Sequence, residues 1–319
     1  MPQTKRSINR PAAAWLVLVI TLCGGEPGTR AAFGDATVET THAPFVFRYV
    51  EADRPLVQAL EGIADRAWAR VTADLGHTPP APITVVLAHT DHAFNQFQPP
   101  DRPLPAWASG VAYPEVMTMV IRSYHAPGSP RQDAGTIFVH ELTHLVLGAR
   151  FGNQPAPRWL HEGVAMYEAG EWRPQHEWAL VRAVLGRGVP PLDELTRFLG
   201  RTEADAATAY LLSEALIGHM IATYGRPAFA DFVARLAEGN TFEDALISVF
   251  GVSESRFEAR WRAHLDRRYT WIPLITSTSA LWVVMMAVAF VAYAVKRRRN
   301  RKIVGAWEEE ERKEGPPTE

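Results

Sequence analysis

The chain is organised around one stretch, Gly135-Thr-Ile-Phe-Val-His140-Glu141-Leu-Thr-His144-Leu-Val-Leu147. Residues four apart lie one turn apart on the same face of an α-helix, so His140 and His144 can direct imidazole nitrogens at one metal ion. The surrounding residues are mostly apolar, which predicts a buried helix that exposes polar groups only to a cleft. Together with the adjacent carboxylate of Glu141, this pattern predicts a zinc-binding helix that carries its own general base.

A purely structural interpretation competes with the metal site. In that interpretation, His140 and His144 are core residues hydrogen-bonded to backbone carbonyls. Two imidazoles and a carboxylate on one buried face would then need separate partners, because unpartnered buried polar groups are costly. One metal ion satisfies both imidazoles at once, so we favour the metal site.

A catalytic zinc site usually has three protein ligands and one position open to water, so a third ligand is expected downstream. The turn-rich link at residues 152–157 ends the first helix and lets a second helix, beginning near Arg158, fold back alongside it. Glu162 on this second helix is our candidate ligand. His161 competes with it, because adjacent helical residues point about 100° apart and only one of the two can face the ion.

Two motifs carry a resemblance to a known family, His140-Glu-Leu-Thr-His144 and Trp159-Leu-x-Glu162-Gly-x-Ala-x-Tyr167. They resemble the gluzincin zinc metallopeptidases, specifically the bacterial peptidase MA-like group. The resemblance covers roughly residues 80–268. It implies that Glu162, rather than His161, completes a site for one Zn²⁺ ion, and that the substrate is a peptide or protein.

The sequence lacks the motifs of two other groups of zinc peptidases. No Gly-x-Met-Glu-Asn motif precedes the zinc helix, so the aminopeptidase branch is not supported. The His-x-x-Gly-x-x-His continuation is also missing, which argues against a metzincin.

Tyr210 is a further candidate for catalysis, because it occupies about the place where gluzincins carry a tyrosine that stabilises the oxyanion. A packed aromatic residue at a helix start is the competing interpretation of Tyr210.

The residues on either side of the zinc helix predict an α+β fold. We expect strands and helices before it and an almost entirely helical segment after it, interrupted at glycines. The expected strands lie within residues 37–50, 83–87 and 107–122, the expected helices at 56–75, 91–97 and within 136–268. With the resemblance, this predicts a zincin-like peptidase domain, residues 37–268, with an N-terminal mixed β-sheet lobe and a helical C-terminal lobe. Val116–Ile121 is the candidate strand for binding an extended substrate.

Residues 1–32 have the composition of a signal peptide. Basic residues precede an apolar run at residues 12–22, and small residues follow it. The single cysteine, Cys23, would leave with this segment, so the exported chain would contain no disulfide.

Residues 272–295 contain no charged residue and are long enough for one transmembrane helix. Six of the seven residues at 296–302 are basic, which places the tail, residues 296–319, in the cytoplasm. A buried core helix would seldom lack every charge and end in such a cluster. The sequence therefore predicts a single-pass protein of the cell membrane with its peptidase domain on the extracytoplasmic side.

These features predict a membrane-anchored zinc metallopeptidase that uses metal-activated water, with Glu141 as general base. The alternative is a catalytically inactive, membrane-anchored zinc-binding scaffold, which would have no need of Glu141 between the two ligands. A nucleic-acid binder finds no support, since the formal net charge is −2 and the only dense basic run is at residues 296–302.

Overall fold

The computed structural model describes residues 37–98, 108–123, 133–172, 174–186, 188–269 and 278–314. The predicted signal peptide, residues 1–32, lies outside the described residues. The chain divides into two compact units, Met1–Ala263 and His264–Glu319. The first unit contains the predicted zinc helix.

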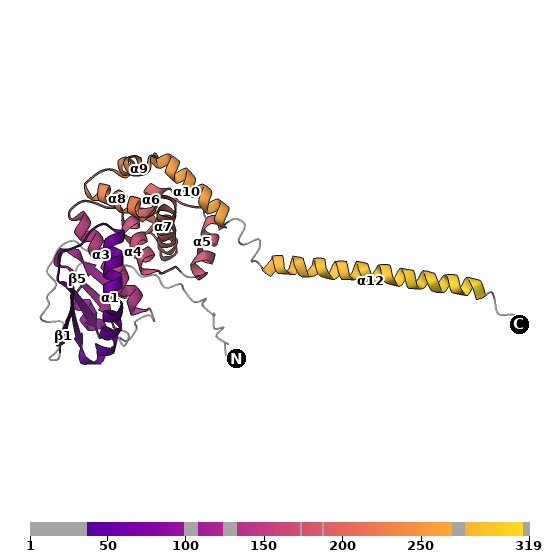
Figure 1. Ribbon diagram of the computed structural model, residues 1–319, viewed down its shortest axis with the longest axis horizontal. Coiled ribbons are helices and arrows are strands. Elements are labelled where there is room, and N and C mark those ends of the chain that lie inside the picture. The colour runs from indigo at the N-terminus through magenta and orange to yellow at the C-terminus, as the bar shows by residue number, and fades with distance from the viewer. Residues whose placement is uncertain are drawn as a thin grey trace, which may run out of the picture. The chain divides into compact units, whose positions relative to one another are not determined.

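A five-stranded mixed sheet forms the N-terminal lobe of the first unit (Figure 1). Its strands are β1 (Thr37–His42), β2 (Phe45–Val50), β3 (Ile83–Ala88), β4 (Gly110–Tyr113) and β5 (Thr118–Arg122). The order across the sheet is β1-β2-β3-β5-β4, with β2, β3 and β5 parallel and the two outer strands antiparallel to their neighbours. The edges of the sheet are therefore β1 and β4.

One face of the sheet packs against α1 (Arg54–Asp74) and α3 (Ala134–Phe151), the predicted zinc helix. Alternate residues of β2 are aromatic and fully buried, as expected for a strand with one face in the core. The ring of Phe138 on α3 lies 5.2 Å from that of Phe45 and 6.4 Å from that of Phe47, measured between centroids. These aromatic contacts fix α3 against the sheet.

The opposite face is covered in part by the short helix α2 (Asp91–Gln96). Thr90 caps this helix, because its hydroxyl accepts a hydrogen bond from the backbone N–H of Ala93. A continuous apolar cluster forms beneath α2, and its members are Val86, Ala88, Ala93, Phe94, Phe97, Ala108, Val111, Tyr113 and Val120. Both faces of the sheet are thus largely buried at β3, β4 and β5, whereas β1 and alternate residues of β2 stay exposed or half-buried.

The C-terminal lobe is helical. Its helices are α4 (Arg158–Ala169), α5 (Pro174–Gly186), α6 (Leu192–Phe198), α7 (Glu203–Tyr224), α8 (Arg226–Ala237), α9 (Phe242–Phe250) and α10 (Glu254–Tyr269). Two short 3-10 helices, η1 (Glu51–Asp53) and η2 (Pro114–Val116), belong to the sheet lobe. The prediction of an α+β fold with a mixed sheet followed by a helical body is therefore confirmed.

A close approach between α4 and α7 sets the geometry of the helical lobe. A β-carbon built on Gly163 would come within 2.7 Å of the carbonyl oxygen of Ser213. Only glycine permits this separation, so Gly163 allows the two helices to pack closely. This close packing of α4 against α7 fixes the rotation of α4 about its axis, and with it the direction in which Glu162 points.

The prediction that Val116–Ile121 binds an extended substrate is wrong. Strand β5 pairs with β3 on one side and with β4 on the other, so its backbone groups are already used. An added strand needs a free edge. The free edge on this side of the sheet belongs to β4, which also lies beside α3.

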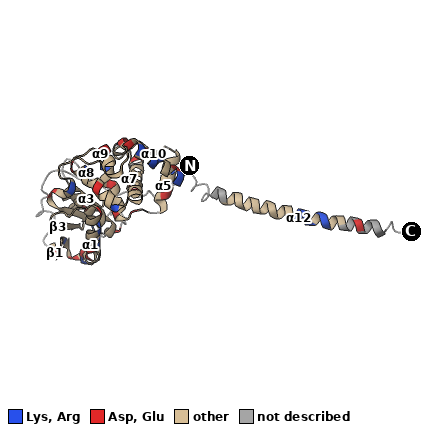
Figure 2. Cartoon of the chain, turned by 45° about the horizontal axis from the view of Figure 1, so that its top comes forward, with Lys and Arg blue, Asp and Glu red and all other residues tan. Residues whose placement is uncertain are grey.

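The second unit contains α12 (Thr278–Glu314), so only part of the predicted transmembrane segment, residues 272–295, is described. Figure 2 shows a long tan stretch of α12 followed by blue residues, in agreement with the basic run at 296–302. Within the part of the chain that the structure describes, no helix is both long enough and apolar enough to cross a membrane.

Candidate metal centre

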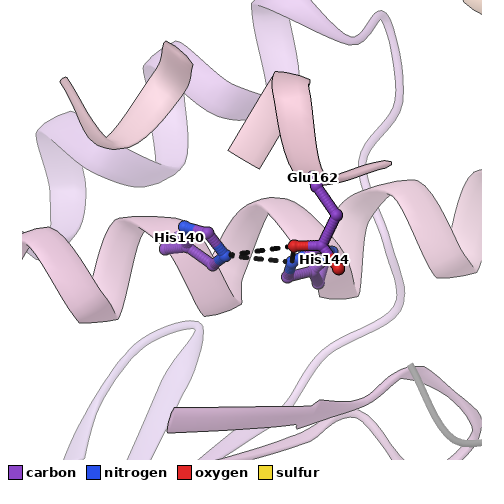
Figure 3. Close-up of side chains that lie close together, drawn as sticks. All are labelled: His140, His144 and Glu162. Atoms are coloured by element: carbon purple, nitrogen blue, oxygen red, sulfur yellow. Dashed lines mark hydrogen bonds and ion pairs between the residues drawn. The ribbon is translucent and has the colours of Figure 1, made fainter. Parts of the chain in front are cut away.

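Three side chains converge where α3 meets α4 (Figure 3). His140 and His144 lie one turn apart on α3, both are buried, and their Nε2 atoms are 3.1 Å apart. Glu162 reaches them from α4, with its Oε2 atom 4.0 Å from Nε2 of His140 and 3.8 Å from Nε2 of His144. The structure therefore brings together the three residues predicted as ligands.

This arrangement fits a zinc ion. A tetrahedral ion with Zn–N bonds of about 2.0–2.1 Å separates its ligand atoms by roughly 3.3 Å, close to the distances observed. Glu162 Oε2 is buried and has no hydrogen-bond partner among the described residues, an arrangement that a cation would satisfy. Among the described residues, this is the one group of three potential ligands close enough to hold an ion.

The protonation of the two histidines is set by burial and by their neighbours. Burial lowers the pKa of His144, and the charge of His140 lowers it further, so His144 is neutral and able to bind metal. Burial alone would also lower the pKa of His140, but the charge and hydrogen bond of Glu171 outweigh it and raise the pKa to about 9. Burial raises the pKa of Glu162 to about 7.

Glu171 is a site residue that sequence analysis missed. Its Oε1 atom lies 2.6 Å from Nδ1 of His140, so the imidazole Nδ1–H donates a hydrogen bond to the carboxylate and Nε2 is directed at the metal position. Glu171 follows Gly170, whose left-handed conformation (φ 67°) ends α4 and turns the chain back toward α3. A ligating histidine commonly has a carboxylate partner, but no local sequence pattern distinguishes Glu171 from the other glutamates.

Glu141 lies beside the converging residues, and its two carboxylate oxygens are buried without hydrogen-bond partners in the described residues. Burial raises its pKa to about 8, and the negative charge of Glu162 acts in the same direction. A cation bound at the neighbouring metal position would act in the opposite direction and favour the carboxylate form that a general base needs. The position of Glu141 therefore suits the predicted general base.

Tyr210 is fully buried on α7, and its hydroxyl oxygen accepts a hydrogen bond from Nη2 of Arg158 at 3.3 Å. Burial raises the pKa of the phenol above its usual value, and the charge of Glu162 raises it further. Tyr210 therefore stays protonated and lies close enough to Glu162 to respond to its charge. Arg158 also approaches Glu162, with its Nε atom 3.5 Å from Oε1.

His161, the competing third ligand, is not one of the three converging residues. Its ring lies nearly parallel to that of His144 at a centroid distance of 6.2 Å. The ring of Phe151 is its second aromatic neighbour, at a centroid distance of 5.4 Å. Burial lowers the pKa of His161 to about 4, so the ring is neutral. We conclude that His161 packs beside the metal position while Glu162 points into it.

A cavity of about 880 Å³ borders this site. Its walls come from the end of α3, the following link, η2 and the start of α4, and they include Pro114, Gly148, Phe151, Gln154, Arg158 and Glu162. A volume of this size lies within the range of cavities that hold small organic ligands. Of the three predicted ligands, Glu162 forms part of the cavity wall, whereas His140 and His144 do not.

Comparisons with known proteins identify one family model and several solved structures. The family model of the Peptidase MA superfamily matches residues 63–267. An M1 zinc metallopeptidase from Deinococcus radiodurans is 15% identical with a TM-score of 0.39, over 71% of this chain and 50% of that chain. A mutant of an enzyme of this kind bound to a Tyr-ser-ala substrate, also from Deinococcus radiodurans, has the same identity and TM-score, over 71% and 51%. The chain thus spans about half the length of these structures, and no curated protein matches it.

Proposed function

We propose that this chain, which belongs to the Peptidase MA superfamily, is a zinc-dependent metallopeptidase that hydrolyses peptide bonds with metal-activated water. The observation that carries the proposal is the convergence of the Nε2 atoms of His140 and His144 with the buried Oε2 atom of Glu162. Two imidazole nitrogens and one carboxylate oxygen leave a fourth tetrahedral position open, as catalytic zinc sites require.

Each residue of the site has a separate role in this proposal. His140, His144 and Glu162 would hold one Zn²⁺ ion. When bound, the ion lowers the pKa of a water molecule and polarises the scissile carbonyl. Glu141 takes a proton from the water and passes it to the leaving amine. Tyr210 donates a hydrogen bond to the oxygen on which negative charge develops.

The test combines metal analysis with a peptide-library digest of the full chain and of Glu141→Gln. The proposal expects about one zinc per chain in both proteins and cleavage by the wild type only. An active Glu141→Gln variant would remove Glu141 from the role of general base. Zinc without cleavage in the wild type would instead support a zinc-binding scaffold.

We also propose that residues 272–295 anchor the protein in the cell membrane, with residues 37–268 on the extracytoplasmic side. The support is the composition of the sequence, because 272–295 lacks charge and 296–302 is basic. A signal peptide at residues 1–32 would direct this orientation. The full chain should then stay in the membrane fraction after alkaline extraction, and its release into the supernatant would contradict the anchor.

A further inference from the structure

Arg158 contacts two of the residues assigned above. It is the first residue of α4 and lies one turn before Glu162, the spacing of an (i, i+4) ion pair. Its Nε atom is 3.5 Å from Oε1 of Glu162, while its Nη2 donates to the hydroxyl oxygen of Tyr210 at 3.3 Å. One guanidinium group therefore joins a predicted metal ligand on α4 to a predicted oxyanion donor on α7.

The two oxygens of Glu162 are in different situations. Oε1 faces the guanidinium of Arg158, whereas Oε2 faces the two histidines and has no hydrogen-bond partner in the part of the chain that the structure describes. With Oε1 held, only Oε2 is free to bind an ion. A carboxylate without such a partner can bind through both oxygens, which changes the coordination number of the metal.

The hydroxyl of Tyr210 is oriented by the same group. Arginine has donors and no acceptor, so the hydroxyl oxygen must accept the hydrogen bond from Arg158. The hydroxyl hydrogen is then left for a second partner. The rigid planar fork of the guanidinium can hold both neighbours at once, which a lysine ammonium on a flexible stem cannot do as well.

We propose that Arg158 is a positioning residue that acts through both neighbours. It keeps Glu162 bound to the metal through Oε2 alone, and it holds the Tyr210 hydroxyl so that its hydrogen is available to the oxyanion. The inference rests on the proposed peptidase function for its Tyr210 part. Its Glu162 part concerns metal binding alone and can be tested without turnover.

The chain offers a matched control for the loss of an arginine. Arg262 on α10 forms an (i, i+4) pair with Glu258 at 2.7 Å, and its side chain is 36% exposed, compared with 35% for Arg158. The two arginines differ in the burial of their glutamate partners, because the side chain of Glu258 is 24% exposed and that of Glu162 only 2%. Arg262→Gln thus removes a similar charge and ion pair outside the metal site.

The first experiment measures the visible absorption of the full chain loaded with Co²⁺ in place of Zn²⁺. Four-coordinate Co²⁺ absorbs more strongly than five-coordinate Co²⁺, so the band reports how Glu162 binds. We expect Arg158→Gln to weaken the band, because the freed Oε1 joins Oε2 on the metal, while Arg262→Gln keeps the wild-type spectrum. A wild-type spectrum in Arg158→Gln, at equal metal content, would overturn the Glu162 part.

The second experiment measures peptide hydrolysis at saturating zinc, with metal content and circular dichroism checked for each variant. Removing an oxyanion donor costs about 10²–10³-fold in kcat, and we expect Arg158→Gln to lose about tenfold or more with little change in KM. In a Tyr210→Phe background, Arg158→Gln should cause almost no further loss, because the residue it positions is gone. Arg158→Lys should lie between wild type and Arg158→Gln, and it replaces the glutamine variant if that fails to fold.

Fully additive losses in the double variant would overturn the Tyr210 part, as would wild-type kcat in Arg158→Gln. These results differ from a failure of the proposed function. An inactive wild-type protein with a normal Co²⁺ band would defeat the peptidase assignment, together with the Tyr210 part that rests on it. The spectrum of Arg158→Gln would still decide the Glu162 part.

Discussion

Gly110 on the edge strand β4 lies directly against the carboxylate of Glu141. A β-carbon built on Gly110 would come within 2.3 Å of Oε1 of Glu141 and 2.8 Å of its carboxyl carbon. No real β-carbon approaches another atom so closely, so any other residue here must displace the glutamate side chain or the strand. The absence of a side chain at Gly110 thus determines where the proposed general base lies.

Gly110→Ala should therefore damage catalysis more than metal binding. A shift of about 1 Å in a catalytic group can cost on the order of 10²-fold in rate, so we expect kcat to fall about 10–100-fold with zinc affinity nearly unchanged. Overpacking should also cost about 1–3 kcal/mol in the free energy of unfolding. Steady-state kinetics, zinc titration and urea denaturation would measure these three quantities.

Gly62 provides the control for this substitution. A β-carbon there meets no atom of the described residues within 4 Å, and the residue lies on the exposed side of α1. Gly62→Ala should stabilise the protein by about 0.5–1 kcal/mol, because alanine favours a helix interior. Equal kcat values for Gly110→Ala and the wild type would contradict the role assigned to the contact.

Glu141→Gln should keep its zinc and lose most of its turnover. The amide cannot accept the proton of the attacking water, and loss of a general base typically costs about 10²–10⁴-fold in rate. Metal analysis and kcat measured on the same sample separate the two effects. A variant that lost its zinc as well would place Glu141 among the ligands instead.

Glu171→Gln should weaken zinc binding. The charged partner of His140 Nδ1 becomes a neutral amide, and loss of such a partner typically costs 10–100-fold in metal affinity. Competition with a chromophoric chelator would measure the affinity. Glu238→Gln, at a side chain that is 58% exposed, is the control and should bind zinc like the wild type.

Removal of the metal should destabilise the wild type and leave His144→Ala unaffected. Zinc that binds only the folded state at 100 times its Kd stabilises that state by about 2.7 kcal/mol. For a unit of this size, that corresponds to roughly 5–10 °C in Tm. Differential scanning calorimetry with and without chelator would measure the shift, and an equal shift in His144→Ala would place the metal elsewhere.

The stability of the metal-free protein should fall as pH rises, in part because of Glu214. Burial raises the pKa of this carboxyl from 4.5 to about 8. Between these values the folded state keeps a proton that the unfolded state has lost, so unfolding becomes easier by up to about 1.4 kcal/mol per pH unit. The contribution is fully present below about pH 4.5 and is lost toward pH 8.

Glu214→Gln replaces the titrating carboxyl group by a neutral amide, so this contribution to the pH dependence of stability disappears. The variant should gain stability relative to the wild type as pH rises from 5 to 8, measured by urea denaturation of chelator-treated protein. Glu238→Gln should follow the wild type at every pH, since its side chain is exposed. Parallel curves for Glu214→Gln and the wild type would show that the carboxyl is already ionised in the folded state.

The sequence was sufficient for features that repeat along the chain. Helical periodicity placed His140, Glu141 and His144 on one buried helix, and glycines marked the ends of the helices that follow. The same local signals predicted the strands, since backbone geometry alternates side chains from one residue to the next. The resemblance to a known family added the preference for Glu162, which the residues alone left open against His161.

The tertiary structure decided the contacts between distant segments. The rotation of α4, fixed where Gly163 meets α7, turns Glu162 toward the histidines and His161 away. Thirty-one positions separate His140 from Glu171, and the order of the strands makes β4 the free edge rather than β5. Periodicity describes neighbours along the chain, whereas strand order and helix rotation depend on burial and hydrogen bonding across the whole fold, which no single segment contains.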